Sequence, residues 1–165
     1  MKNEAVVIYS GGMDSTVLLY HLIASQMKVA ALSIDYGQRH RRELEAAKRI
    51  TSELEIEHHV ADLSLLRPLM AGSSQTSDGI AVPHGHYESE SMKVTVVPNR
   101  NMLMLAVAGA WAISRKSDLI AYAAHAGDHA IYPDCREEFV RPLAEALVNA
   151  DWHRVDILRP FVRMT

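Results

Sequence analysis

The stretch VVIYSGGMDSTVLLYHL, residues 6–22, decides the fold of this chain. Its first residues, VVI at 6–8, are β-branched and apolar, which is the pattern of a buried strand in a parallel sheet. From Asp14 onward apolar residues recur at helical spacing, so a helix is predicted to begin near that residue. The segment SGGMDS, residues 10–15, is then the turn between strand and helix. Such a turn points backbone N–H groups outward at the positive end of a helix dipole, and we expect it to bind an anion.

Strand and helix patterns alternate along the rest of the chain. Further strands are predicted at residues 29–35, 56–63, 118–126 and 154–161. Further helices are predicted at 41–55 and 102–114, and a turn that leads into a helix at 132–148. This alternation predicts an α/β fold with a doubly wound parallel sheet between two layers of helices, in a single domain over residues 1–165. Residues 64–97 lack periodicity and predict a long loop of the kind that often binds ligands.

Composition excludes several classes of protein. The chain has 165 residues, of which 48% are hydrophobic and 22% charged, as in an ordinary globular domain. A net charge of −3 gives no sign of a nucleic-acid partner. The sequence has no apolar run long enough for a membrane span and no signal-peptide pattern, so a cytoplasmic location is expected. The single cysteine, Cys135, excludes an intrachain disulfide and a multi-cysteine zinc site.

Polar clusters follow the predicted strands. They occupy residues 10–15, 35–40, 98–101 and 125–136. Because ligands of doubly wound sheets bind outside the carboxyl ends of the strands, we expect these clusters to meet in one site.

The turn at residues 10–15 matches neither a Walker A loop nor a G-x-G-x-x-G loop. The string S-G-G-x-D-S resembles the pyrophosphate loop (PP-loop) of the N-type ATP pyrophosphatases, which implies an adenine nucleotide alpha-hydrolase-like fold and bound ATP. The hydroxyls of Ser10 and Ser15 and the N–H groups around Gly11 and Gly12 suit phosphate oxygens. Asp14 is itself negative and suits Mg²⁺ between carboxylate and phosphate. The alternative is a glycine turn that only caps a helix through Asp14 or Ser15.

Three further strings narrow the resemblance. DYGQRH at 35–40, VPNRN at 97–101 and HAGDHAIYPDCREEF at 125–139 resemble the family of 7-cyano-7-deazaguanine synthases, over about residues 6–161 in total. The resemblance implies an ATP-dependent ligase of queuosine biosynthesis. Such an enzyme converts 7-carboxy-7-deazaguanine and ammonia to 7-cyano-7-deazaguanine through an adenylated carboxylate and an adenylated amide.

The resemblance also implies roles for individual residues. Catalytic roles fall to Asp14, Arg39 and Arg100, since a guanidinium binds carboxylates and phosphates equally well. Backbone groups at the end of the second strand, from Ser33 to Asp35, are expected to face the adenine. The expected substrate-binding set is Gln38, Arg100, Asn101, Asp128, Tyr132, Asp134 and Arg136. Two alternatives stay open, namely that Asn101 is a helix cap and that Tyr132 packs at a helix entry.

Other reactive side chains are given structural roles. Cys135 is expected to be a small buried residue rather than a nucleophile, because adenylation followed by ammonia attack needs no thiol. The pairs His58 with His59 and His84 with His86 lack nearby carboxylate or cysteine partners, so we expect solvated loop histidines rather than metal ligands.

The sequence departs from the family in one respect. Family members continue through a further helix and a cysteine cluster that binds structural zinc, whereas this sequence has no C-x-x-C. Apolar surface near Phe161 is therefore expected to be covered by another chain, in a homodimer or by a second polypeptide. Two alternative functions remain, namely a related adenylating enzyme with another nucleobase or carboxylate substrate, and a nucleotide-binding subunit without turnover.

Overall fold

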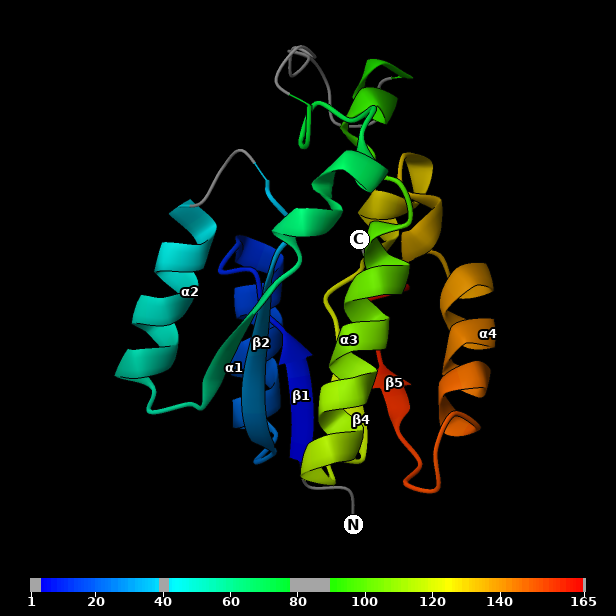
Figure 1. Ribbon diagram of the computed structural model, residues 1–165. Coiled ribbons are helices and arrows are strands. Elements are labelled where there is room, and N and C mark those ends of the chain that lie inside the picture. Colours follow the sequence, from blue (N-terminus) through cyan, green and yellow to red (C-terminus); the bar gives the residue numbers. More distant parts are fainter. Residues whose placement is uncertain (1–3, 39–41, 78–89, 165) are drawn as a thin grey trace.

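The computed structural model describes residues 4–38, 42–77 and 90–164. Within them, five strands form one parallel sheet in the order β3-β2-β1-β4-β5 (Figure 1). The strands are β1 (Glu4–Ile8), β2 (Lys28–Asp35), β3 (His58–Asp62), β4 (Leu119–Ala121) and β5 (Asp156–Leu158). The α-helices are α1 (Met13–Ala24), α2 (Arg42–Glu53), α3 (Arg100–Arg115) and α4 (Glu137–Val148). None of the described helices is long and apolar enough to cross a membrane.

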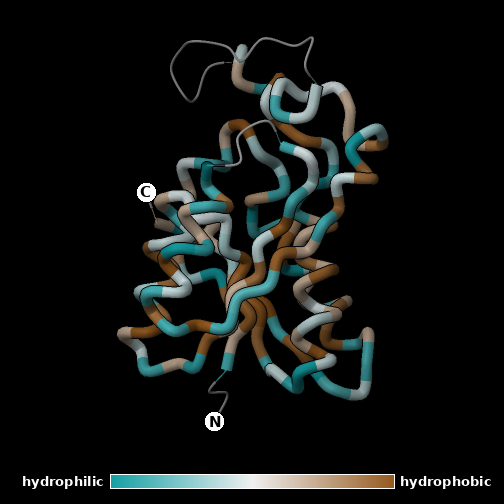
Figure 2. The backbone as a smooth tube through the Cα atoms, turned by 60° about the vertical axis from the view of Figure 1, so that its left-hand side comes forward, coloured by the Kyte–Doolittle hydropathy of each residue, from teal (hydrophilic) through white to brown (hydrophobic). Residues whose placement is uncertain are grey.

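Two hydrophobic layers cover the two faces of the sheet. Along β1, Val6 and Ile8 join the core beneath α3 and α4, whereas Val7 joins the core beneath α1 and α2. Alternate side chains of a strand point to opposite faces, so a strand buried on both faces must be apolar throughout. Figure 2 shows the hydrophobic segments running through the central strands. The predicted doubly wound α/β fold is confirmed.

The winding of the chain reverses beside β1. Helices α1 and α2 connect β1 to β2 and β2 to β3 on one face, while α3 and α4 lead to β4 and β5 on the other. The crevice at such a switch point is where doubly wound folds bind ligands. At this carboxyl end of the strands lie four 3-10 helices, η1 (Ser64–Met70), η2 (Glu90–Thr95), η3 (Ala126–Ala130) and η4 (Pro133–Cys135) (Figure 1).

Several predicted boundaries were wrong. The strand predicted at 118–126 is only β4, because its neighbour β1 ends at Ile8 and the chain then turns into η3. By contrast, the turn predicted to lead into a helix at 132–148 is confirmed, because Pro133 opens η4 and α4 begins at 137. The predicted loop at 64–97 contains η1 and η2 among its described residues.

The predicted placement of the histidines in loops was also wrong where the structure describes them. His58 and His59 are the first residues of β3. His58 is half-buried and bonded on both ring nitrogens, to Ser33 and to Thr51. His84 and His86 lie outside the described residues.

An ion-pair cluster closes the amino end of the sheet. Arg115, at the end of α3, donates to Glu4 at 2.8 Å and to both carboxylate oxygens of Glu57 at 2.9 and 3.0 Å. Its guanidinium also lies 4.8 Å from the ring centre of Trp111. The hydrogen bond from Arg115 lowers the pKa of Glu57 despite partial desolvation. This cluster ties α3 to the sheet at the end away from the crevice.

Candidate functional site

A cavity of about 290 Å³ lies at the carboxyl end of the sheet. All the predicted polar clusters contribute to its wall, which confirms that they meet. The predicted residues in this wall are Ser10, Gly12, Asp14, Ser15, Gln38, Arg100, Asn101 and Asp128. Apolar side chains, among them Ile34, Leu44 and Met104, complete it. A cavity with polar groups on an apolar wall suits a small ligand.

The turn at residues 10–15 leads into α1 without a described side chain that caps the helix. The N-cap of α1 is Gly12. The Ser10 and Ser15 hydroxyls are 3.1 Å apart, and Ser15 donates to the Gly12 carbonyl oxygen at 3.1 Å. The alternative that Asp14 or Ser15 only caps the helix is therefore wrong. Uncapped N–H groups beside two hydroxyls form a cradle for an anion.

Gly11 fixes this turn against α2. Its φ is +84°, a left-handed conformation that favours glycine. A Cβ placed on it would stand 2.1 Å from the carbonyl oxygen of Glu43 and 2.7 Å from the backbone nitrogen of Ala47. The turn and α2 thus touch backbone to backbone, and only glycine permits that approach.

A histidine faces the carboxylates of the cavity. The Nε2 atom of His125 lies 3.8 Å from Asp14 Oδ2 and 3.7 Å from Asp128 Oδ2. Its Nδ1 accepts from the backbone N–H of Gly127 at 3.1 Å, so a neutral ring carries its proton on Nε2. Asp128 in turn accepts from the His125 backbone N–H at 3.3 Å. These bonds aim an N–H group at the gap between the carboxylates.

Arg100 brings a permanent positive charge to the cavity wall. Burial acts to lower its pKa, but its hydrogen bond with Tyr36 and the nearby Asp134 carboxylate outweigh that effect and hold the pKa above the usual range. A guanidinium in this setting stays charged and suits a carboxylate or a phosphate of a ligand.

Asn101 joins α3 to the segment around η4. Its side-chain amide donates to the Asp134 carbonyl oxygen at 3.3 Å and to Cys135 Sγ at 3.4 Å, and its backbone N–H donates to Asp134 Oδ2 at 3.2 Å. The N-cap of α3 is Asn99, so the alternative that Asn101 caps the helix is wrong. Asp134 does not line the cavity; one of its oxygens holds α3, and the other is buried without a hydrogen-bond partner among the described residues.

The end of β2 borders the cavity at Ile34, and the expected contact of its backbone with adenine stays a prediction. Ser33 is fully buried and donates to the Tyr9 carbonyl oxygen, and Asp35 accepts from the backbone N–H of Gly37 at 2.9 Å. Neither of these predicted adenine-site residues lines the cavity. Because side chains alternate along a strand, Ile34 faces the cavity in their place.

Two predicted substrate residues also lie outside the cavity wall. Arg136 donates through Nε and Nη2 to the carbonyl oxygen of His129 and so braces the turn. The Tyr132 hydroxyl is 2.8 Å from Thr95 Oγ1, which fits the alternative of a tyrosine packed at a helix entry. Arg39 lies outside the described residues.

Sequence reasoning missed several residues of the cavity wall. Tyr36 lies inside the quoted string DYGQRH, and its position after a strand was a usable signal. His125 is not part of the wall, but its Nε2 faces two carboxylates of the wall, Asp14 and Asp128. Glu43 reaches the cavity only because α2 packs on Gly11, which no local pattern shows. Tyr122 lies in the predicted strand at 118–126, and nothing in its sequence surroundings marks it as a residue of the cavity wall.

Cys135 is predicted to be unreactive in the folded protein. It is buried in the cavity wall, and desolvation together with Asp128 and Asp134 raises the pKa of its thiol to about 12. Because the thiolate is the reactive form, iodoacetamide at pH 8 should label the folded chain at least about 100-fold more slowly than the urea-unfolded chain. Cys135 is the single cysteine, so intact-mass spectrometry measures this directly. Equal rates in the two states would contradict the burial.

The described residues contain no cluster of metal ligands, but one carboxylate, Asp14, lies in the turn at residues 10–15. Among residues 4–38, 42–77 and 90–164, no three His, Cys, Asp or Glu side chains are grouped so as to hold a metal ion. That part of the chain therefore offers no ligand set for structural zinc. Asp14 is different, because a single carboxylate beside a phosphate cradle is how Mg²⁺ is commonly held.

Comparison with known proteins places this geometry in a family. The family model described as queuosine biosynthesis protein QueC matches residues 4–165. The 7-cyano-7-deazaguanine synthase of Hahella chejuensis is 50% identical over the whole chain, which covers 71% of that protein. The 7-cyano-7-deazaguanine synthase 1 of Colwellia psychrerythraea is 51% identical over 98% of the chain and 74% of its own length.

Solved structures support the fold. A predicted subunit of tRNA methyltransferase from Methanocaldococcus jannaschii matches with a TM-score of 0.59 at 12% identity, over 98% of this chain and 69% of that one. The NH3-dependent NAD synthetase of Campylobacter jejuni matches with a TM-score of 0.50 at 18% identity, over 78% of this chain and 50% of that one. Identities this low speak to the fold alone, which is the predicted adenine nucleotide alpha-hydrolase-like fold. The family match and the relatives at about half identity settle the family: this chain belongs to the queuosine biosynthesis protein QueC family.

Proposed function

We propose that this chain uses ATP and ammonia to convert 7-carboxy-7-deazaguanine to 7-cyano-7-deazaguanine. One observation carries the proposal: the uncapped start of α1, with the Ser10 and Ser15 hydroxyls, shares a cavity with the charged guanidinium of Arg100. The cavity thus offers one place for phosphates and one for a carboxylate. Relatives at about 50% identity are named for this reaction.

ATP lies with its β- and γ-phosphates on the turn at residues 10–15. The Ser10 and Ser15 hydroxyls and the first N–H groups of α1 bind the pyrophosphate that leaves. The adenine lies against the end of β2, where Ile34 and Leu44 supply apolar surface and Gln38 supplies an amide. Asp14 would hold Mg²⁺, which would neutralise part of the phosphate charge.

Arg100 binds the carboxylate of the deazaguanine. The carboxylate oxygen attacks the α-phosphorus of ATP and pyrophosphate leaves, which turns a poor leaving group into AMP. Ammonia then displaces AMP and forms the amide. The amide oxygen then attacks the α-phosphorus of a second ATP, and pyrophosphate and one N–H proton leave. Loss of AMP together with the second N–H proton gives the nitrile. The residues act by positioning and by charge neutralisation, without a covalent enzyme intermediate.

Mass spectrometry of a reaction tests this proposal. The purified chain is incubated with Mg-ATP, ammonium and 7-carboxy-7-deazaguanine, and both the deazapurine and the adenine nucleotide are followed. We expect the nitrile together with AMP, and no AMP when the deazapurine is left out. Accumulation of the amide alone would limit the chain to the first half of the reaction. The absence of AMP, from folded protein that binds ATP, would overturn the proposal and favour a nucleotide-binding subunit.

The predicted homodimer or second polypeptide stays a prediction. Apolar side chains exposed on α1 are Met13, Val17 and Tyr20, and Phe161 packs beside them against the ring of His21. Such a stripe is suited to contact with another protein surface. Analytical ultracentrifugation of the purified chain, with Val17→Glu as the disrupting variant, measures whether α1 is that contact.

A further inference from the structure

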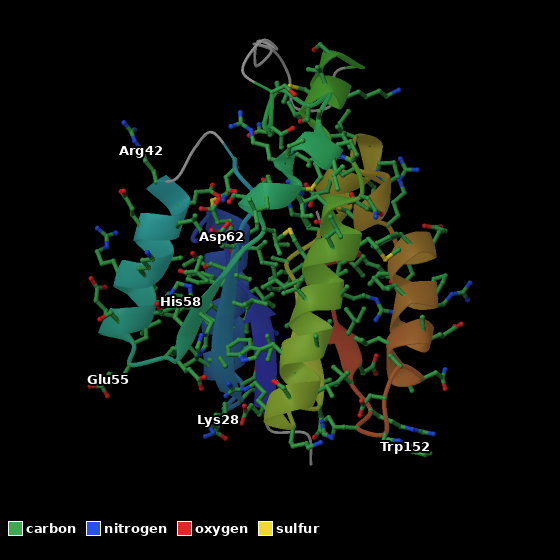
Figure 3. All side chains as sticks on the ribbon, viewed as in Figure 1. Lys28, Arg42, Glu55, His58, Asp62 and Trp152 are labelled. Atoms are coloured by element: carbon green, nitrogen blue, oxygen red, sulfur yellow. The ribbon has the colours of Figure 1, made fainter. Side chains whose placement is uncertain are left out.

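We infer that His58 is a positioning residue for the phosphate-binding turn, acting through Ser33 on β2 and Thr51 on α2. The catalytic consequence of this inference rests on the function proposed above, but the contacts themselves do not. His58 lies on β3 beside α2, away from the cavity wall (Figure 3). It therefore acts on the turn without touching a ligand.

The two ring nitrogens of His58 join different elements. Nε2 lies 2.7 Å from Ser33 Oγ, and Ser33 itself donates to the carbonyl oxygen of Tyr9. Nδ1 lies 3.1 Å from Thr51 Oγ1. Tyr9 is the residue directly before the turn, and Ser33 and Thr51 are almost completely buried. One imidazole thus connects the end of β1 with α2.

Counting protons fixes the direction of these bonds. A carbonyl oxygen only accepts, so the single hydroxyl proton of Ser33 goes to Tyr9. Ser33 Oγ must then accept from His58, which places a proton on Nε2. The Thr51 hydroxyl donates its single proton to the Ala47 carbonyl oxygen at 2.8 Å. In a neutral ring Nδ1 is an acceptor, so at 3.1 Å it shares that proton as a second acceptor.

The surroundings of His58 favour this neutral ring. Burial, followed by the positive charge of Lys48 and the neighbouring His59, lowers the pKa of His58 below its ordinary value. The ring edge also meets the Tyr9 ring, at a centroid distance of 6.5 Å. His58 is therefore a fixed hydrogen-bond connector at neutral pH.

The two elements that His58 connects are the ones that hold Gly11. Ala47 and Glu43 of α2 form the surface against which Gly11 packs, and Thr51 is one helical turn further along the same helix. Tyr9 is fixed a second time, because its hydroxyl lies 3.2 Å from Thr16 Oγ1 in α1. A shift of α2 relative to β1 would move Gly11 and Gly12 and so change the phosphate cradle.

Steady-state kinetics with both substrates varied test the inference. In His58→Leu we expect the KM for ATP to rise about tenfold, the size of effect that follows loss of buried hydrogen bonds, while the KM for the deazapurine changes less than about twofold. In His58→Gln most of the loss should be recovered, because a glutamine N–H can reach Ser33 Oγ. The matched control is His59→Gln, on the next residue. The exposed ring of His59 lies 3.4 Å from Glu57 and packs edge-on against Trp111 at a centroid distance of 4.9 Å, so it contacts neither Ser33 nor Thr51.

Calorimetric titration with Mg-ATP separates this inference from the proposed function. If the wild-type chain binds ATP without turnover, the proposed function fails, and weaker ATP binding by His58→Leu still supports the positioning role. If His58→Leu is folded by circular dichroism and binds ATP as the wild type does, the inference is overturned. Should His58→Leu not fold, Ser33→Ala breaks the same link with a smaller change, and unchanged ATP affinity in that variant overturns the inference equally.

Discussion

Replacing Arg100 by methionine is expected to lower kcat/KM for the deazapurine by about 100-fold or more. The guanidinium is enclosed in the cavity wall, where the surrounding protein screens its charge less than water does. Removing it takes away the counter-charge for the carboxylate of the ligand and a positive charge near Asp134. Losses of about 3–5 kcal/mol are typical when one partner of an enclosed charge pair is removed. Steady-state kinetics of the purified variant measure this loss of kcat/KM for the deazapurine.

The matched control for Arg100 lies at the other end of the same helix. Arg115→Met removes the hydrogen bonds that the Arg115 guanidinium donates to Glu4 and Glu57, so it should lower the melting temperature. The kcat/KM of the folded Arg115→Met variant should stay within about twofold of the wild-type value, because Arg115 lies far from the crevice. Arg100→Lys keeps the charge but loses the planar fork, and an intermediate loss is expected. Equal kinetic losses in Arg100→Met and Arg115→Met would mean that Arg100 acts only through stability.

The fold was largely predictable because its rules are local or follow from the parallel sheet. The apolar run before the turn predicts a strand buried on both faces, and β1 is such a strand. The carboxyl ends of parallel strands meet at one edge, so the polar clusters had to converge there. The end of β4 was not predictable, because residues 122–125 have strand-like composition. They lack a partner in β1, which ends at Ile8 and turns away.

The site was predictable in outline and not in its details. Alternation along β2 could have shown that Ser33 and Asp35 face away from the side on which Ile34 lies. The entry of Glu43 into the cavity depends on the contact of α2 with Gly11, which is set by tertiary packing. The role of Asp134 depends on the approach of α3, since its Oδ2 accepts from Asn101. Positions fixed by docking between elements leave no periodic signal in the sequence.

Replacing Gly11 by alanine is expected to have the largest effect on stability. The new Cβ would meet the Glu43 carbonyl oxygen at 2.1 Å and the Ala47 nitrogen at 2.7 Å, and both are backbone atoms of α2 that cannot rotate away. The φ of +84° adds strain for any residue with a side chain. Together these should cost about 3 kcal/mol or more, which corresponds to a melting temperature lower by about 10 °C in a chain of this size. Affinity for ATP should fall at least about tenfold, because the turn must leave α2 to relieve the clash.

The control for Gly11→Ala separates backbone strain at a positive φ from steric overlap of the new Cβ with α2. Gly72 also has a positive φ, of +102°, but nothing lies within 4 Å of a Cβ placed there, and it does not line the cavity. Gly72→Ala should therefore show the backbone strain alone, about 1–2 kcal/mol, with unchanged ATP affinity. Thermal melts and calorimetry of the two variants side by side measure both quantities. If Gly11→Ala had the same melting temperature as Gly72→Ala and kept its ATP affinity, the contact with α2 would not hold the turn in place. His58 could then not influence phosphate binding through Thr51, because the position of α2 would not determine the position of the turn.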